Sequence, residues 1–247
     1  MGGLELGPSR DSEESSNSVK LLLTSSQMQT LHNSQNLFLE GPAGRLEAIL
    51  WTPSRSDSPS LAAVVCHPHP LFGGTMHNKV VYNAARTLGA LGIPVLRFNF
   101  RGAGLSAGKH DKGRGEQGDV QAALDYLTAQ CPGIPLLLAG FSFGSVVGLR
   151  VGCRDTRVGE LIGIGIPVNS SDFSFLADCL KPKLFVHGAN DQFGARTKVE
   201  EVIASLQGEK HLVVVEDADH FFAGHLEEFN AAIAAWLTKR HPSLGST

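Results

Sequence analysis

Short apolar runs alternate with amphipathic segments along most of the 247-residue chain. Short continuous apolar runs are typical of strands that are buried on both faces of a parallel sheet. We expect strands at residues 61–66, 94–98, 135–141, 161–166, 183–187 and 211–215. Helical spacing predicts helices at residues 80–91, 119–130, 143–152, 197–206 and 225–239. This strand–helix order predicts an α/β fold, with a mostly parallel sheet covered by helices on both faces.

The region before the first buried strand has a different pattern. Residues 35–40 and 46–51 have the composition of two strands, and the turn chemistry of residues 41–44 between them favours a hairpin. Residues 1–34 are rich in serine, carry a cluster of acids and show little periodicity, which predicts a disordered tail. A targeting or docking segment is the alternative for that tail. We therefore expect one α/β domain at residues 35–247.

Composition narrows the class of protein. The formal net charge is −3 and the basic residues are scattered, so we expect no nucleic-acid partner. No apolar run approaches the roughly 20 residues of a membrane-spanning helix, and no export signal is recognisable. We therefore expect no membrane partner. The four cysteines show no paired spacing, so we expect reduced thiols and a cytoplasmic location.

A G-x-S-x-G motif stands between a predicted strand and a predicted helix, at residues 140–144. In a nucleophile elbow the serine sits on a sharp strand-to-helix turn, and the glycines allow neighbouring backbone to approach. The N–H groups of the following helix favour negative charge beside the serine oxygen. A simple Gly/Ser turn is the alternative, but the strand–helix context favours Ser142 as a nucleophile.

A serine hydroxyl needs a base, and the chain has ten histidines. His220 follows the last predicted strand and precedes the last helix, so its loop lies at the same sheet edge as the elbow. His211 begins a strand, His225 and His241 resemble surface positions, and His187 ends a strand where packing is expected. His220 is therefore the predicted base.

The base in turn needs a carboxylate that holds the imidazole and stabilises the imidazolium. Asp191 directly follows the penultimate strand, so the chain order becomes serine, aspartate, histidine. Asp172, after the preceding strand, is the rival. Asp217 and Asp219 are too close in sequence to His220 to reach its ring easily. The alternative role for Asp191 is a helix cap.

An oxyanion produced by attack on a carbonyl needs two backbone donors. The N–H of Phe143, directly after the serine, is the first. The second is expected in the His-Pro-His-Pro-Leu segment after the first buried strand, where the prolines have no N–H. His69 and Leu71 are both open as that donor, and His69 is favoured because it comes second after the strand end.

Two further motifs suggest cofactors only weakly. His67 and His69, with His77 nearby, could be thought to bind zinc, but no cysteine or carboxylate accompanies them at a matching spacing. The Gly-rich segment at residues 101–106 lacks the glycine and lysine positions of nucleotide-binding loops, and Arg101 is expected to pair with an acid, Asp119 or Glu116. We expect neither a metal nor another cofactor.

Several of these segments together resemble a known group. The stretch His-Pro-His-Pro-Leu-x-Gly-Gly-Thr-Met-x-Asn-Lys-Val-Val at residues 67–81 is similar to that of small, lid-less bacterial α/β hydrolases near the dienelactone hydrolases. The segments at residues 101–106, 140–144, 187–191 and 219–222 fit the same group. The resemblance covers about residues 35–237.

This resemblance implies the α/β-hydrolase fold and a triad of Ser142, Asp191 and His220. Many enzymes of this fold insert a helical lid between the strands predicted at 161–166 and 183–187, and this chain has no room for a large one. True dienelactone hydrolases use a cysteine nucleophile, so their reaction is not carried over to a chain that has a serine.

The expected activity is therefore hydrolysis of a small-molecule ester through an acyl-enzyme. Phe72, Phe143, Phe173 and Phe175 are candidates for an apolar acyl pocket, although packing explains the last two equally well. A peptidase or amidase with the same triad is the first alternative, because the fold hosts both. A non-catalytic ligand-binding protein is the second. The sequence leaves the natural substrate and the oligomeric state open.

Overall fold

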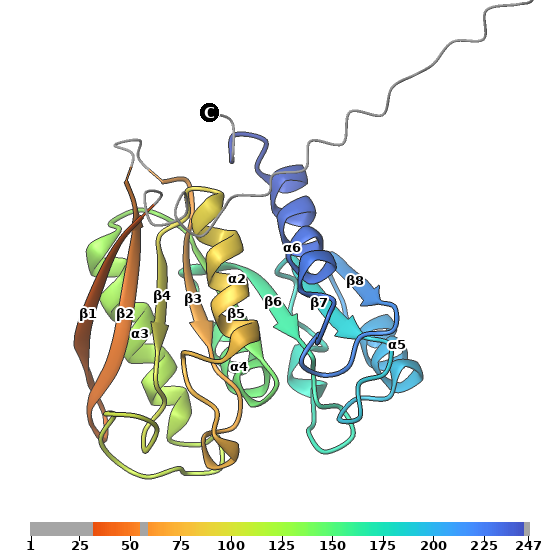
Figure 1. Cartoon of the computed structure of the whole chain (residues 1–247), viewed down its shortest axis with the longest axis horizontal. Helices are drawn as coiled ribbons and strands as arrows, with labels where there is room; N and C mark the ends of the chain where they lie inside the picture. Colours follow the sequence, from red (N-terminus) through yellow and green to blue (C-terminus); the bar gives the residue numbers. More distant parts are fainter. Residues whose placement is uncertain (1–31, 55–58, 245–247) are drawn as a thin grey trace, which may run out of the picture.

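The computed structural model describes residues 32–54 and 59–244 (Figure 1). Within these residues an eight-stranded sheet has the order β1-β2-β4-β3-β5-β6-β7-β8. Its strands are β1 (His32–Gly41), β2 (Gly44–Pro53), β3 (Ala62–Cys66), β4 (Val95–Phe98), β5 (Leu136–Phe141), β6 (Val158–Ile164), β7 (Lys183–Gly188) and β8 (Lys210–Val215). The helices are α2 (Lys79–Ala90), α3 (Glu116–Gln130), α4 (Phe143–Arg154), α5 (Arg196–Ser205) and α6 (Leu226–Arg240), with short 3-10 helices η1 (Pro70–Phe72) and η2 (Ser174–Leu176).

The sheet is mostly parallel, as the sequence pattern predicts. Strands β4, β3, β5, β6, β7 and β8 pair in parallel, whereas the β1–β2 hairpin pairs antiparallel within itself and against β4. Strand β1 begins at His32, earlier than the expected residue 35. The rest of the predicted tail, residues 1–31, lies outside the described residues.

Helices cover both faces of the sheet. In Figure 1, α2 and α6 lie in front of the strands, whereas α3 and α4 lie behind them. One buried apolar cluster joins α2 and α6 to their face, and a second joins α3, α4 and α5 to the other. The short strands β3 and β5 are buried along their whole length because both of their faces are covered, which explains their continuous apolar sequences.

Strand β6 differs most from the expectation, because it starts at Val158 rather than at residue 161. Its early part contains Glu160, a residue that breaks the apolar run. The carboxylate of Glu160 is buried and pairs with Arg240 and His241 at the end of α6, at 2.8 and 3.0 Å. A polar position inside a strand is tolerated here because its charge has partners.

The carboxyl ends of the parallel strands share one edge, and the loops that follow them gather there. The segment between β6 and β7 contains only the short helix η2, so no helical lid covers this edge. The fold class and the missing lid are thus as predicted. Within residues 32–54 and 59–244, no helix is long and apolar enough to cross a membrane, and the cytoplasmic location stays a prediction.

Candidate active site

Ser142 occupies a strained turn between β5 and α4. Its backbone has φ 54° and ψ −120°, values that a residue with a side chain rarely adopts. The turn is held by its own hydrogen bonds: the Ser142 N–H donates to the Ile164 carbonyl at 2.9 Å, and its carbonyl accepts from the Ser145 hydroxyl at 2.6 Å. The backbone of Ser142 is therefore fixed by contacts on both sides.

The two glycines of the motif are required by close backbone contacts. A Cβ on Gly140 would overlap the carbonyl of Gly144, and a Cβ on Gly144 would overlap the carbonyls of Cys66 and His67. The start of α4 is thus pressed against the end of β3. This contact brings the residue after the serine next to the loop in which the second oxyanion donor is expected.

His220 and Asp191 form a buried pair in the loops after β8 and β7. Nδ1 of His220 lies 2.7 Å from Oδ2 of Asp191. A carboxylate only accepts, so Nδ1 carries a proton, and in a neutral ring the lone pair is then on Nε2. The other carboxylate oxygen of Asp191 accepts the N–H groups of Phe193 and Gly194, at 2.8 and 3.3 Å. Asp191 is therefore fixed by the backbone while it orients the imidazole.

The histidine ring lies over the elbow. The ring centroids of His220 and Phe141, the residue before Ser142, are 4.9 Å apart. Gly165 lies directly beneath both rings, because a Cβ there would come within 3.2 Å of each. The preceding residue, Ile164, accepts the N–H of Ser142. The structure therefore brings the serine, the histidine and the aspartate to one part of the sheet edge.

The rival carboxylates have other partners. Asp172 accepts the N–H and the hydroxyl of Ser174, at 2.8 and 2.7 Å, and these bonds lower its pKa. Asp219 accepts the N–H groups of Phe221 and Ala223. Asp191 is the carboxylate that contacts His220. A role as a helix cap, the alternative for Asp191, would not explain this bond to the ring.

His187 packs behind the pair, as expected for a histidine at a strand end. Its Nε2 donates to the Gly194 carbonyl at 2.7 Å and lies 3.7 Å from Oδ2 of Asp191. Burial lowers its pKa, so it stays neutral near pH 7. His187 thus supports the turn that holds the carboxylate without competing for it.

The His-Pro-His-Pro loop distinguishes the two candidates for the second oxyanion donor. The N–H of Leu71 donates to Nδ1 of His69 at 3.2 Å, so it is already engaged. The His69 carbonyl accepts from Phe72 and Gly74, whereas among the described residues the His69 N–H makes no hydrogen bond. The N–H of Phe143 is also free of a helical acceptor, because it is in the first turn of α4.

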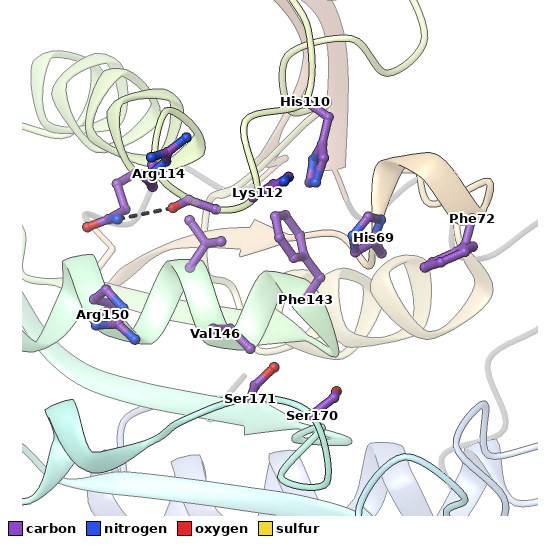
Figure 2. A pocket seen from close by; sticks show the side chains of 13 residues that line it. His69, Phe72, His110, Lys112, Arg114, Phe143, Val146, Arg150, Ser170 and Ser171 are labelled. Carbon is purple, nitrogen blue, oxygen red and sulfur yellow. Dashed lines mark hydrogen bonds between the residues drawn. The ribbon is translucent and has the colours of Figure 1, made fainter.

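A cavity of about 610 Å³ opens beside these donors (Figure 2). Phe72 and Phe143 line it, as expected for a substrate pocket. For the other two phenylalanines, where a substrate pocket and packing were equally open, the structure shows packing. Phe173 is buried in the core, and Phe175 packs against that core with its ring 4.2 Å from the guanidinium of Arg150. Both rings already have packing partners and do not line the cavity.

Two aromatic residues flank the histidine and were not expected from the sequence. The rings of Phe193 and Phe221 lie 4.6 and 5.2 Å from the ring of His220, and both are 44–47% exposed. The sequence signal that could have identified them is their position, since Phe193 is two residues after Asp191 and Phe221 directly follows His220. They form apolar walls at the outer side of the histidine.

The Gly-rich segment after β4 has a structural role. Arg101 pairs with the buried carboxylate of Asp119 through Nε and Nη2, at 3.0 and 2.7 Å, which raises the arginine pKa. Of the two expected partners, Asp119 is therefore the one that binds Arg101. Glu116 instead lies 2.8 Å from Nδ1 of His110.

The two histidines considered for a zinc site, His67 and His69, lie in different surroundings. His67 is buried; its Nδ1 donates to the Pro68 carbonyl and its Nε2 accepts the N–H of Phe100, at 2.6 and 2.9 Å. His69 instead faces the cavity. Across residues 32–54 and 59–244, no group of three His, Cys, Asp or Glu side chains is arranged to hold a metal ion.

Comparison with known proteins agrees with this geometry. A family model described as an alpha/beta hydrolase domain matches residues 58–232. The chain belongs to the α/β-hydrolase family. It is 39% identical over 210 residues to the uncharacterized protein RP471 of Rickettsia prowazekii, covering 81% of this chain and 87% of that one.

Two solved structures of α/β hydrolases are similar over nearly their whole length. XC6422 from Xanthomonas campestris, an α/β serine hydrolase without a lid, has a TM-score of 0.79 and 38% identity, with 87% of this chain and 97% of that chain covered. An α/β serine hydrolase homologue from Coxiella burnetii has a TM-score of 0.78 and 36% identity, with 82% and 97% covered. The family predicted from the motifs is thereby confirmed.

Proposed function

We propose that this α/β hydrolase cleaves small ester substrates through an acyl-enzyme formed on Ser142. The observation that supports the proposal most strongly is the 2.7 Å bond between His220 and Asp191, buried beside a strained serine elbow. It leaves Nε2 as an acceptor on the side of the ring that Asp191 does not occupy. A neutral imidazole with that lone pair free can accept the proton of a serine hydroxyl.

In the first half of the proposed reaction, Oγ of Ser142 attacks the acyl carbon and His220 accepts the hydroxyl proton. The N–H groups of Phe143 and His69 stabilise the oxyanion, and Asp191 stabilises the imidazolium. The leaving alcohol takes the proton from His220 as the bond to oxygen breaks. Water then attacks the acyl-enzyme, with His220 again as base. His220 gives this proton to Oγ of Ser142 as the bond between Oγ and the acyl carbon breaks and the acid is released.

Small substrates fit this site because no lid covers it. The segment between β6 and β7 contains only η2, and the half-exposed rings of Phe193 and Phe221 are what packs against the outer side of the buried histidine. Without a lid, the site lacks the apolar surface that would cover a long acyl chain, and this favours short or moderate acyl groups.

Steady-state hydrolysis of para-nitrophenyl acetate, butyrate and octanoate, together with aminoacyl para-nitroanilides, tests the proposal. We expect turnover of the short esters to exceed that of the anilides. Ser142→Ala should remove it, whereas Ser205→Ala, at an exposed serine of α5, should not. Preferred cleavage of the anilides would replace the esterase assignment by an amidase. Unchanged turnover in Ser142→Ala would contradict the proposed mechanism.

A further inference from the structure

The cavity beside the elbow follows one face of helix α4. Phe143, Val146, Val147 and Arg150 line it, and their spacing along the helix places them on one side. The loop before α3 forms a second wall, and Ser170 and Ser171 form a third (Figure 2). Phe143 is the residue after the serine, so the cavity begins at the elbow and extends toward Arg150.

The lining of this cavity is cationic. Lys112, Arg114 and Arg150 contribute positive charges, His69 and His110 contribute imidazoles, and no aspartate or glutamate lines it. Figure 2 shows Lys112 and Arg114 on the wall opposite Arg150. Three cations around a concave surface without a lining carboxylate favour an anionic occupant.

The carboxylates near the cavity compensate this charge only in part, because none of them lines it. Asp111 contacts Arg114 at 3.2 Å, but this pair is exposed and therefore weak. Asp172 is hydrogen-bonded to Ser174, and the charge of Arg150 also contributes, as the smallest cause, to lowering the pKa of this exposed carboxyl. Among the described residues, neither Lys112 nor Arg150 forms an ion pair; the Arg150 guanidinium instead lies over the ring of Phe175.

The loop that carries Lys112 is held in place from below. The buried carboxylate of Glu116 accepts the N–H groups of Asp111 and Gly113, at 2.8 and 2.9 Å, on either side of the lysine. Lys112 itself has a left-handed backbone with φ 54°. A non-glycine residue keeps this conformation only where its surroundings enforce it, so the lysine is fixed by the structure rather than displayed on a free loop.

We propose that this cavity binds an anionic group of the substrate, a carboxylate or a phosphate, at the far end from the scissile bond. The proposal deepens the esterase assignment and rests on it for the identity of the bound molecule. The arginine forks of Arg114 and Arg150 match the paired oxygens of either group, and Lys112 adds a point charge. Because His69 and Phe143 line the cavity and also offer the oxyanion donors, one molecule can occupy both places.

Matched pairs of esters test the charge preference. para-Acetoxybenzoate against para-acetoxybenzamide places the charge on the leaving group, and the para-nitrophenyl monoester of adipate against its methyl diester places it on the acyl group. Rates are divided by those of alkaline hydrolysis to remove intrinsic reactivity. We expect kcat/KM for the anionic member of at least one pair to be about tenfold higher, and the preference to fall at about 0.5 M salt.

Variants connect the preference to the cavity. Lys112→Gln and Arg150→Gln should each reduce the anionic-to-neutral ratio of kcat/KM by about fivefold or more, and Arg150→Lys should restore part of it. Lys198→Gln is the control, because it removes one charge from the exposed surface of α5. Thermal unfolding of each variant shows whether it is folded. An unchanged ratio in both Gln variants would overturn the proposal.

Isothermal titration calorimetry with adipate and with inorganic phosphate examines the cavity without turnover. Binding that weakens in Lys112→Gln supports the site, and the tighter ligand identifies the anion as carboxylate or phosphate. If no ester is hydrolysed but this binding persists, the esterase assignment fails and the anion site stands. If neutral esters are hydrolysed as well as anionic ones and neither anion binds, the anion site fails and the esterase stands.

Discussion

Two buried carboxylates at the same sheet edge lie at nearly the same distance from histidine rings. Asp191 lies 2.7 Å from Nδ1 of His220, and Glu116 lies 2.8 Å from Nδ1 of His110. In both, backbone N–H groups of the adjacent loop also donate to the carboxylate. By distance alone, either pair would be a candidate for an acid–base site, but only the His220 contact is a hydrogen bond, and among the described residues Nδ1 of His110 has no hydrogen-bond partner.

The surroundings of the two pairs differ. His220 packs against Phe141, directly before Ser142, and within the described part of the chain its ion-pair partner is Asp191 alone. His110 packs against the rings of His69 and Phe143 on the wall of the cavity. The carboxylate of Asp191 therefore orients the ring of the proposed base, whereas that of Glu116 holds the loop of Lys112 through backbone N–H groups. The role of a carboxylate–histidine contact therefore depends on which residues surround the histidine ring.

Replacing each carboxylate by its amide separates the two roles most strongly. Asp191→Asn should lower kcat by about 10⁴-fold, because the imidazole loses its orienting acceptor and takes the wrong tautomer. Glu116→Gln should lower kcat by less than about tenfold and act mainly on KM for anionic esters, because it loosens only the lysine loop. Equal losses of kcat in the two variants, measured with para-nitrophenyl acetate, would remove the distinction between the pairs.

His67 extends the comparison to a buried histidine without a carboxylate. Burial lowers its pKa from 6.5 to about 4. Unfolded His67 binds a proton below about pH 6.5, whereas the folded residue does not until about pH 4, so stability falls as the pH drops through this window. The loss is up to about 3 kcal/mol.

Urea unfolding at about pH 7 and about pH 4.5 measures this loss. In His67→Gln the acid-dependent loss should be smaller than in the wild type by about 2–3 kcal/mol. His211→Gln, at an exposed ring, is the control and should keep the wild-type pH dependence. If the free energy of unfolding of His67→Gln still falls as steeply in acid as that of the wild type, other titratable groups cause the loss.

The structural role of Glu116 predicts a smaller effect on stability. Glu116→Gln should reduce the free energy of unfolding by about 1–3 kcal/mol, because an amide nitrogen then faces an N–H group that needs an acceptor. Glu216→Gln, which breaks an exposed pair with Arg196, should cost less than about 1 kcal/mol. If Glu116→Gln is no more destabilising than Glu216→Gln in urea, the carboxylate does not hold the loop.

The smallest expected effect concerns the aromatic rings that pack beside His220. Phe193→Leu should lower kcat/KM by about 2–5-fold, because the ring contact that restrains His220 is lost. Phe38→Leu replaces a similarly exposed phenylalanine on the edge strand β1 and should leave the rates unchanged. The two variants are compared with the same ester, and equal rates in both would show that the wall does not restrain the histidine.

The fold and the position of the elbow could be predicted from the sequence because both are local patterns. Continuous apolar runs marked the buried strands, and the motif around Ser142 had the strand and helix that it requires. The choice between His69 and Leu71 could not be made, since each has a backbone N–H. The structure adds that the Leu71 N–H already donates to the ring of His69, and His69 stays the proposed donor.

The cationic cavity had no comparable signal. Lys112 and Arg114 stand in a Gly-rich loop without periodicity, and Arg150 is one polar position on a helix. They meet because Glu116 folds the loop over α4. Phe173 and Phe175 show the opposite case. The sequence left both a substrate pocket and packing open for them, and in the structure Phe173 packs in the core and Phe175 packs against the core and Arg150.

The central claim, that Ser142 is the nucleophile, is tested most directly by a fluorophosphonate probe and mapping of the modified residue by tandem mass spectrometry. The account predicts one adduct per chain on Ser142, none in Ser142→Ala, and slower labelling in Asp191→Asn than in Glu116→Gln. An adduct on another serine, or no adduct on a folded protein that hydrolyses esters, would contradict it.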